Sequence, residues 1–533
     1  MSLPSPTDLD KKHFDAHDEV AELPGKKQHL SAELTAALDG TSIPRWSAAA
    51  LKLYSKFTPT VPLTPVSIFV ALCCSYANGY DGSVMTALIA MDHFQKRFHA
   101  GTTGGKVGAI FGVYNAGCFI GGPFGAFTMD RFGRRWCMGS GSLLIVVGSV
   151  LTSTATTLVQ FIIGRFVLGF GIAFVQMAGP SYTMEVALPQ WRGRCTGLYN
   201  VGWYFGAIPA AAITFGTNYI NSNLSWQLPL IFQCFAAVLV IGLSPFIPES
   251  PRFLMSRGRE EDAKAFLAKY HGGGDENAPL VKLELEEMRA SLSAVDPAPW
   301  WDYRPLFSTK ASRWRMAQVA MMSIFGQFSG NGLAYFATVI YANIGVTSTT
   351  AQLGYNLLYA AMCAVGALSG AALTDHMPRR MVLTFGTLLL AVLLGIFTGL
   401  NSIIDKDLVR GVPIDEGVGK GAIAVYVLFG VACAFTYTPL QAVVPVEALS
   451  TSMRAKGLAV SNFLMQGMGF VNMFAGPVGL GSIGYRYIFV FVVWDVIEAA
   501  CWWLFGVEAR GRTLEELDWI YEQPNPVKAS KKL

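Results

Sequence analysis

The chain has 533 residues, of which 52% are hydrophobic and 14% charged, and its mean hydropathy is +0.40. These values lie outside the usual range for soluble domains and indicate an integral membrane protein. The formal net charge of +4 gives no reason to expect a nucleic-acid partner, and the nine cysteines show neither metal-ligand spacing nor a disulfide framework. We therefore expect no metal, no cofactor and no enzymatic activity.

Apolar stretches of about 20 residues, the length that crosses a bilayer, recur along the chain in two sets of six. The first set lies near 65–90, 107–127, 137–158, 159–184, 195–216 and 226–247. The second set lies near 315–342, 351–374, 381–400, 421–446, 457–480 and 485–506. This pattern predicts an all-α membrane protein with twelve transmembrane helices.

The predicted domains follow from these stretches and from the polar segments between them. They are a cytoplasmic N-terminal tail (1–60), a six-helix half (61–247), a cytoplasmic central loop with short amphipathic helices (248–314), a second six-helix half (315–508) and a cytoplasmic C-terminal tail (509–533). The polar start of the chain predicts no cleavable signal peptide before the first span.

Most Lys and Arg residues between the spans fall on one side of the membrane, which the positive-inside rule identifies as cytoplasmic, together with both termini. The opposite loops at 217–225 and 343–350 carry no Lys or Arg. Asn223 begins an Asn-Leu-Ser sequon on this outer side. It is a glycosylation candidate, although it lies very close to a span.

The two sets of spans also repeat short motifs in parallel order, which indicates an internal duplication. The repeated elements are Glu185 with Glu447, Arg192 with Arg454, DRFGRR at 130–135 with DHMPRR at 375–380, and Asn78-Gly79 with Asn331-Gly332. The first two pairs are each separated by 262 residues (447 − 185 and 454 − 192). Two parallel six-helix halves with a site between them are the layout of a secondary transporter that alternates access by rocking.

Asp81 stands in the middle of the first apolar stretch, with apolar sequence on both sides. A charge in hydrocarbon is costly, so an intramembrane acid usually faces a cavity or a partner and takes part in handling ions or substrate. The alternative is an acid near the headgroups at a helix end. The continuous apolar flanks favour the functional interpretation.

Six short motifs, taken together, resemble those of the sugar porter family of the major facilitator superfamily, over residues 65 to 521. They are GYD at 79–81, DRFGRR at 130–135, GRFVLGFG at 164–171, PSYTMEVALPQWRG at 180–193, PESPRFL at 248–254 and GRTLEEL at 511–517. NGYDGS, GQFSGN at 326–331 and TPLQAVVPVEALS at 438–450 look most like the fungal lactose-permease-like and cellodextrin-transporter-like branch. The resemblance implies the major facilitator fold and sugar transport.

By this resemblance, Asp81 on the first span and Arg165 on the fourth form the proton-coupling pair. A nearby guanidinium favours the ionised carboxylate, and separation favours its protonation, so a change in their distance loads or releases a proton. The alternative is a permanent ion pair that only fastens two helices.

Acidic and basic residues at the cytoplasmic helix ends are expected to form ion pairs that hold a gate shut. The predicted gate residues are Asp130, Arg131, Arg134, Arg135, Glu185, Arg192, Glu249, Arg252, Asp375, Arg379, Arg380, Glu447 and Arg454. The arginines also serve as topology anchors. That role does not explain why acids accompany them.

A sugar needs many neutral hydrogen-bond partners, because each hydroxyl buried without one costs free energy. The predicted sugar-contacting residues are Gln327, Asn331 and Asn356, followed by Asn200, Trp203, Gln441, Asn462 and Asn472. For each residue the alternative is an interhelical hydrogen bond. The family's tenth-span tryptophan is replaced by Ala442, which leaves room for a disaccharide or a bulkier glycoside.

The sequence thus predicts a monomeric sugar porter of the plasma membrane that imports a sugar together with protons by alternating access. Three alternatives stay open: a facilitative sugar carrier, a transporter of a non-sugar metabolite with the same fold, and a non-transporting sugar sensor. A sensor would favour a longer cytoplasmic tail than the one predicted after residue 521.

Overall fold

The computed structural model of the protein describes residues 63–188, 192–293, 302–373, 376–411, 415–450, 453–510 and 514–532. Every regular element within these ranges is a helix. Residues 66–253 and 294–533 form one compact unit, the helical bundle, and residues 254–293 belong to a separate unit. The predicted N-terminal tail and Asp375 lie outside the described residues.

The first half of the bundle follows the predicted order of six spans. Its helices are α4 (Leu63–Leu88), α6 (Gly105–Phe132), α7 (Arg134–Ser153), α8 (Leu158–Val186), α9 (Arg192–Thr217) and the sixth span, which consists of α10 (Leu224–Phe232), α11 (Cys234–Leu243) and η2 (Ser244–Phe246). The short α5 (Asp92–Phe98) follows the first span.

The second half repeats the plan, with two broken spans. The seventh span consists of α16 (Lys310–Phe328), η3 (Asn331–Phe336) and α17 (Ala337–Asn343), and the tenth of α20 (Glu416–Thr436) and α21 (Leu440–Ala448). The remaining spans are α18 (Thr349–Leu373), α19 (Arg379–Val409), α22 (Arg454–Ile483) and α23 (Ile488–Phe505), the last preceded by η4 (Gly484–Tyr487). The seventh span breaks at Gly330, whose φ of 77° is accessible to glycine but strained for other residues.

The twelve predicted spans all coincide with helices. Eight helical runs in the described residues are long and apolar enough to cross a membrane, and one of them, Lys456–Phe505, covers both the eleventh and the twelfth spans. The predicted spans outside this set are α4, α9 and the α16–α17 run. These three carry polar residues assigned to the transport site, including Asp81, Asn200 and Gln327.

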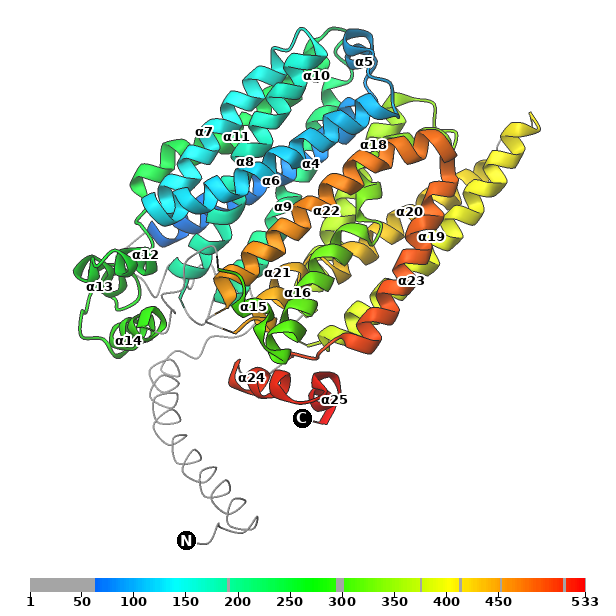
Figure 1. Ribbon diagram of the computed structural model, residues 1–533. Helices are drawn as coiled ribbons and strands as arrows, with labels where there is room; N and C mark the ends of the chain where they lie inside the picture. Colours follow the sequence, from blue (N-terminus) through cyan, green and yellow to red (C-terminus); the bar gives the residue numbers. More distant parts are fainter. Residues whose placement is uncertain are drawn as a thin grey trace. The chain divides into compact units, whose positions relative to one another are not determined.

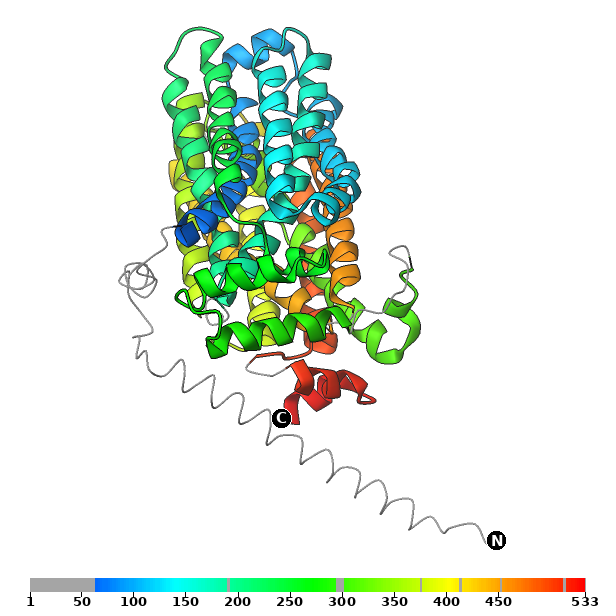
Figure 2. The ribbon, with the colours of Figure 1, turned by 90° about the vertical axis from the view of Figure 1, so that its left-hand side faces the viewer.

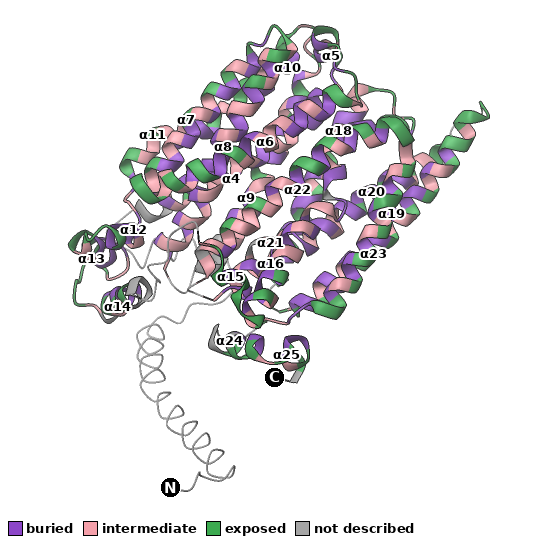
Figure 3. Cartoon of the chain, in the orientation of Figure 1, coloured by how far each residue is buried: buried purple, intermediate pink, exposed green. Residues whose placement is uncertain are grey.

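The bundle helices run side by side in both views (Figures 1 and 2). Within the first half, α8 packs between α6 and α7; contacts between α6 and α22, and between α9 and α18, join the two halves. Burial follows this packing: the buried faces of the helices turn toward their neighbours and the exposed faces point outward (Figure 3). Exposed side chains such as Phe127, Val159 and Val493 are large and apolar, as expected for surfaces that contact lipid.

Glycines allow the helices that carry the site to approach closely. A Cβ on Gly79 would lie 1.8 Å from the backbone oxygen of Trp203, and one on Gly206 would lie 2.0 Å from that of Tyr76. The first span therefore packs directly against the fifth, backbone to backbone. Gly332, which repeats Gly79 in the second half, is packed as closely. A Cβ on Gly332 would lie 2.1 Å from the amide nitrogen of Asn472.

The smaller unit contains the predicted amphipathic helices as α13 (Glu260–Tyr270) and α14 (Pro279–Ser293), which follow α12 (Pro251–Ser256). His271 Nδ1 lies 2.5 Å from Glu284 Oε2, and both side chains are buried. The chain also forms α15 (Pro305–Ser308) before the seventh span, and α24 (Leu514–Glu522) and α25 (Pro526–Lys532) after the twelfth.

Close packing of α6 on α8 makes Gly169→Ala destabilising, because its new Cβ would lie 2.1 Å from the Tyr114 backbone oxygen. We expect a loss of about 1–3 kcal/mol, the usual cost of overpacking, measured as a lower unfolding temperature of the purified protein in detergent. Gly242→Ala is the matched control, since a Cβ there meets nothing within 4 Å. Equal stability of the two variants would contradict this packing.

Candidate functional site

The centre of the candidate site is the Asp81 carboxylate, which is fully buried on α4. Its Oδ1 accepts a hydrogen bond from Arg165 Nη1 on α8 and another, 2.6 Å long, from Gln233 Nε2 in the sixth span. Its Oδ2 has no hydrogen-bond partner among the described residues. The structure therefore brings the two predicted coupling residues together, and half of the carboxylate has no donor.

Gln233 was not predicted from the sequence. It occupies the junction between α10 and α11 and is fully buried. The available signal was a polar amide in a largely apolar span that also contains Gln227, since polar side chains in such positions usually face a partner. Gln233 connects the sixth span to the same carboxylate oxygen that Arg165 binds.

Arg165 is held by an aromatic ring as well as by the acid. Its guanidinium carbon lies 4.7 Å from the centroid of the Tyr114 ring on α6, a cation–π distance. The Tyr114 hydroxyl donates to Asn78 Oδ1 at 3.4 Å. Asp81, Arg165, Tyr114 and Asn78 thus form a chain of contacts across α4, α6 and α8, which a movement of any of these helices would disturb.

On the side of the first half, aromatic rings lie next to the acid. A Cβ on Gly82 would lie 3.2 Å from the Trp203 indole and 3.6 Å from the Tyr335 ring of η3. Trp203 also packs edge-on against Tyr204, with centroids 5.0 Å apart. The predicted Asn200 lies half-buried on the same helix, α9. Trp203 and Tyr335 come from different halves, so the residue after Asp81 lies where the halves meet.

On the side of the second half, amide groups gather around α16. A Cβ on Gly469 of α22 would lie 3.6 Å from Gln327 Oε1 and 3.5 Å from Asn115 Oδ1, so both amides lie beside Gly469. Gln441 Nε2 lies 3.3 Å from the corresponding Cβ position of Gly326 and contacts Met465 Sδ at 3.3 Å. Asn115 was missed, although the Tyr114-Asn115 pair interrupts the second apolar stretch.

Asn356 is the predicted sugar residue with the clearest unused hydrogen-bonding capacity. It lies on α18 and is only 4% exposed, and its Nδ2 has no partner among the described residues. A buried amide donor without an acceptor costs free energy unless a ligand or water satisfies it. This arrangement is what a hydroxyl-recognising position requires before substrate arrives.

Two other predicted sugar residues make contacts between helices. Asn472 Nδ2 donates to the backbone oxygen of Gln327 at 2.7 Å, which favours the interhelical alternative for this residue. Asn462 Nδ2 lies 3.8 Å from the Cβ position of Gly122 on α6, at the contact between the halves. The backbone of Asn331 begins η3, and its side chain lies outside the described part of the structure.

Direct hydrogen bonds connect the halves at the end of the bundle that carries α5. Thr338 Oγ1 donates to the Thr86 backbone oxygen at 2.8 Å, and Asn218 Nδ2 donates to Thr350 Oγ1 at 3.1 Å. At the same end, the Gly104 backbone N–H donates to the Pro477 oxygen at 3.0 Å. Elsewhere, Gln466 Nε2 of α22 donates to Gln176 Oε1 of α8 at 2.9 Å.

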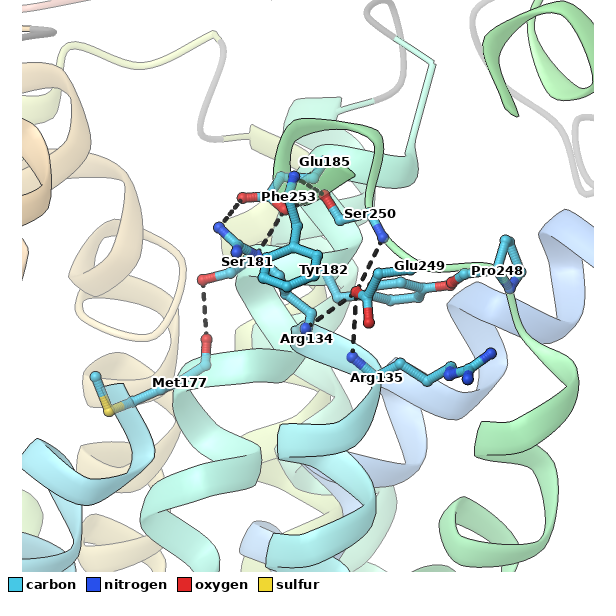
Figure 4. A network of polar contacts seen from close by, with 10 residues as sticks. All are labelled: Arg134, Arg135, Met177, Ser181, Tyr182, Glu185, Pro248, Glu249, Ser250 and Phe253. Carbon is cyan, nitrogen blue, oxygen red and sulfur yellow. Dashed lines mark hydrogen bonds and ion pairs between the residues drawn. The ribbon is translucent and has the colours of Figure 1, made fainter. Parts of the chain in front are cut away.

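The first latch, defined as Arg134, Glu185 and Glu249, fastens helix ends at the other end of the bundle (Figure 4). Arg134 binds both oxygens of Glu185, with Nη2 3.0 Å from Oε1 and Nε 2.9 Å from Oε2. Ser250 Oγ donates to Glu185 Oε2. None of these residues comes from the second half, so the first latch fixes α7, α8 and the 248–250 segment that follows the first half to each other.

Glu249 completes the first latch through backbone groups. Its Oε1 accepts from the N–H groups of Arg134 and Ser250, both at 3.0 Å, and more weakly from that of Arg135 at 3.4 Å. The approach requires Gly133, where φ is 101° and a Cβ would lie 2.3 Å from Glu249 Oε2. Burial raises the pKa of Glu249, outweighing these N–H bonds and Arg134, which lower it.

The second latch, defined as Arg379, Glu447 and Glu508, has the same plan in the other half. Arg379 Nη2 lies 2.7 Å from Glu447 Oε1. The two oxygens of Glu508 accept from the backbone N–H groups of Arg379 and Arg380, each at 3.0 Å. Glu508 was missed because the repeat comparison paired only Glu185 with Glu447. Its position at the end of the twelfth span corresponds to that of Glu249 after the sixth.

The remaining predicted gate residues lie around the latches. Arg135 Nη1 donates to the Ile247 backbone oxygen at 3.2 Å, Arg380 donates to the Trp503 oxygen, and Arg454 Nη2 donates to the Leu449 oxygen at 3.4 Å. Asp130 and Arg131 are exposed, and Arg252 is half-buried in α12. Arg192 begins α9, with its side chain outside the described part. The sequon residue Asn223 is exposed, whereas its Ser225 is buried.

Two bundled six-helix halves with a buried acid–arginine pair and amides between them define a polytopic membrane transporter. Residues 67–521 match the family described as Sugar (and other) transporter. The chain belongs to this sugar transporter family of the major facilitator superfamily, which comprises transporters and not enzymes. The sequence resemblance is thereby confirmed at the level of the family.

Relatives and solved structures agree with this assignment. The chain is 26% identical over 479 residues to the low-affinity glucose transporter HXT1 of Saccharomyces cerevisiae, covering 86% of this chain and 82% of that protein. It is 27% identical over 466 residues to hexose transporter 2 of Kluyveromyces lactis, with coverages of 84% and 81%. The E. coli xylose transporter XylE, partially occluded and inward open, superposes with a TM-score of 0.69 at 20% identity, covering 85% of this chain and all of that one. The structural likeness confirms the predicted twelve-helix fold.

The raised pKa of Glu249 predicts a pH-dependent difference between wild type and Glu249→Gln. The folded protein holds this proton at a pH where an unfolded chain releases it, so the resulting stability is complete below the ordinary value of 4.5 and lost as pH rises through the raised value. The stability of wild type relative to Glu249→Gln should therefore fall as pH rises from 4.5 toward neutrality.

Unfolding temperatures of the two proteins over a pH series measure this difference. Glu261→Gln, at an exposed acid of α13, controls for general effects of charge removal. A stability of wild type relative to Glu249→Gln that rises with pH would contradict a raised pKa. Glu249→Ala should be less stable than Glu249→Gln, because it leaves the backbone N–H groups without an acceptor, at a cost of about 1–3 kcal/mol.

Proposed function

We propose that this sugar transporter imports its substrate together with protons, with Asp81 as the coupling acid. The observation that carries the proposal is the Asp81 carboxylate, which is fully buried and bound through Oδ1 to Arg165 and Gln233, and whose Oδ2 has no donor among the described residues. An oxygen without a donor is where a proton would bind. A buried carboxylate separated from its cation would take up that proton, because desolvation disfavours the charged form.

Coupling then follows from helix movement. Asp81, Arg165 and Gln233 come from the first, fourth and sixth spans of one half. A Cβ on the neighbouring Gly82 would lie 3.6 Å from the Tyr335 ring of the other half, so closure of the halves around a sugar acts on the helix that carries the acid. In our proposal, the proton binds when access is from outside and leaves when the halves rock and Arg165 returns to Asp81.

Sugar recognition is assigned to the amides and aromatic rings between the halves. Gln327, Asn356 and Gln441 supply donors and acceptors, Trp203 supplies an apolar ring face, and the missed Asn115 joins them. Asn331 and Asn200 keep their proposed contact roles, whereas Asn462 and Asn472 are proposed to align helices. Ala442 in the tenth span, together with the motifs of the fungal lactose-permease-like and cellodextrin-transporter-like branch, supports a substrate of disaccharide size.

The same proposal includes the setting of the protein. We place it in the plasma membrane as a monomer, with both termini and the two latches on the cytoplasmic side, residues 61–247 and 315–508 as the moving halves, and residues 248–314 as the loop between them. Asn223 is kept as a glycosylation candidate of low occupancy, because Ser225 of the sequon is buried.

A facilitative carrier is the main competing function. It agrees equally well with the names of the two yeast relatives, which are a glucose transporter and a hexose transporter. The fully buried acid at Asp81 favours coupling, because a carrier without coupling gains nothing from a charge in its core. A non-sugar metabolite transporter and a sugar sensor are distinguished by measuring uptake.

Replacing Asp81 with Asn tests coupling directly. In a transporter-null yeast supplied with labelled glucose, xylose, lactose or cellobiose, wild type should accumulate its substrate and a protonophore should abolish accumulation. Asp81→Asn should lose accumulation but retain counterflow exchange, since the neutral amide still fits the site. Accumulation that survives the protonophore would rule out proton coupling, and loss of substrate binding in Asp81→Asn would instead indicate a purely structural ion pair.

Replacing Asn356 with Ala tests the sugar site. Removing a hydrogen bond to the substrate typically costs about 0.5–1.5 kcal/mol, so the Kd of the transported sugar should rise about threefold to tenfold. Asn401→Ala is the matched control: Asn401 is a buried asparagine of α19 whose amide bonds to the Phe397 backbone oxygen. Equal Kd values for both variants, measured by equilibrium binding, would remove Asn356 from the site.

A further inference from the structure

Two acids of the twelfth span lie on its inward face. Asp495 and Glu498 are both fully buried, as are Phe491 and Trp502 on the same face of α23. Val493 and other residues of the opposite face are exposed. The structure places both acids in the core of the second half.

Few hydrogen-bond donors are available to stabilise a negative charge on these two carboxyl groups. Neither oxygen of Asp495 has a hydrogen-bond partner among the described residues, and neither has Glu498 Oε1. Glu498 Oε2 accepts one bond, from the Tyr437 hydroxyl at 3.1 Å. Three of the four carboxyl oxygens therefore have no donor among the described residues.

Among the described residues, the surroundings add aromatic rings, and neither acid has a basic partner. From α16, Phe325 and Phe328 pack against Trp494, with ring centroids 6.3 and 6.0 Å apart. The nearby titratable groups are Tyr437, Cys433 of α20 and Cys501 of α23 itself.

The basic group of α19 nearest to this part of α23 is already engaged. Arg380 Nε donates to the Trp502 backbone oxygen at 3.5 Å, and its Nη2 donates to that of Trp503. In the described residues neither acid forms an ion pair, so nothing balances a negative charge here. A buried carboxylate without a cation costs several kcal/mol even after relaxation, and two on one helix three residues apart also repel each other.

Tyr437 connects this pair to the proposed sugar site. Its hydroxyl lies between Glu498 Oε2 and Thr387 Oγ1, 2.8 Å from the latter. It is the first residue of the break between α20 and α21, and its ring lies 3.8 Å from the Cβ position of Gly326, next to Gln441. A displacement at the break between α20 and α21 would move Tyr437 and so change its hydrogen bond to Glu498.

We propose that Asp495 and Glu498 form a second proton-binding site, separate from Asp81, that is protonated at neutral pH and anchors the break of the tenth span through Tyr437. Each carboxylate binds one proton from water, with formation of an O–H bond and no redox change. Loss of these protons at alkaline pH places charge beside the break and loosens it. Proton binding by the pair is independent of the proposed function, whereas its effect on exchange rests on that function.

Infrared spectroscopy of the purified protein tests protonation. At neutral pH, wild type should show the carbonyl stretch of protonated carboxylic acids, and Asp495→Asn and Glu498→Gln should each lose part of it. Glu416→Gln, at an 84% exposed acid paired with Lys420, is the matched control and should lose none. Asp81→Asn is recorded separately to subtract any contribution of that acid.

An unchanged protonated-carboxyl band in both variants would overturn the proposal. If a variant of the pair fails to fold, the wild-type band decides after subtraction of the contributions measured with Asp81→Asn and Glu249→Gln: the remaining protonated band should persist at neutral pH and disappear on alkalinisation. Its absence at neutral pH would show that the pair is ionised and would likewise overturn the proposal.

Counterflow exchange of labelled sugar over a pH series tests the link to the tenth span. Wild-type exchange should fall several-fold at alkaline pH, and Glu498→Gln and Asp495→Asn should lack that fall because neither amide ionises. Tyr437→Phe should keep the protonated band but change exchange at neutral pH. The same alkaline fall of exchange in all variants would overturn the link between the acid pair and the tenth span. A wild-type protein without any exchange would count against the proposed function and leave the infrared result unaffected.

Discussion

Asp81 and Arg165 meet where water has no access, and this burial governs how the first half is built. Breaking a buried ion pair by removing one partner typically costs about 3–5 kcal/mol, so the contact must be held by rigid packing. Gly79 allows α4 to lie directly on the backbone of α9, and Gly169 allows α8 to lie on α6. Gln233 then donates a hydrogen bond to the acid, and the Tyr114 ring lies against the arginine. Any movement that separates the acid from the arginine must disturb this packing as a whole.

The same arrangement of charged side chains holds the helix ends of both halves. Each latch binds an arginine to a glutamate of a neighbouring helix, and a second glutamate caps the backbone N–H groups where the next helix begins. Neither latch contains a residue of the opposite half. Each latch ties helix ends together on its own side of the bundle, while individual hydrogen bonds such as Thr338 to Thr86 connect one half to the other. Rigid halves joined by few polar contacts are suited to rocking.

Much of this architecture was predictable from the sequence. The twelve spans and the parallel repeat follow from hydropathy and motif spacing, and the contact between Asp81 and Arg165 follows from the resemblance to sugar porters. Gln233, Asn115 and Glu508 were missed because each is a single polar residue whose importance depends on which helices pack together. Hydropathy measures the length of a helix but not which neighbour its polar face meets. The same limit explains why Asn472 could not be assigned to sugar or to a neighbouring helix before its bond to the Gln327 backbone was known.

Asp495 and Glu498 show the same limit of hydropathy in the twelfth span. Their burial shows that a helix at the edge of a half can present acids to its core. Proton movement itself is the most direct test of coupling at Asp81. In lightly buffered vesicles containing the purified protein, addition of the transported sugar should alkalinise the outside as protons enter with it. Sugar entry without any change in external pH would contradict the account.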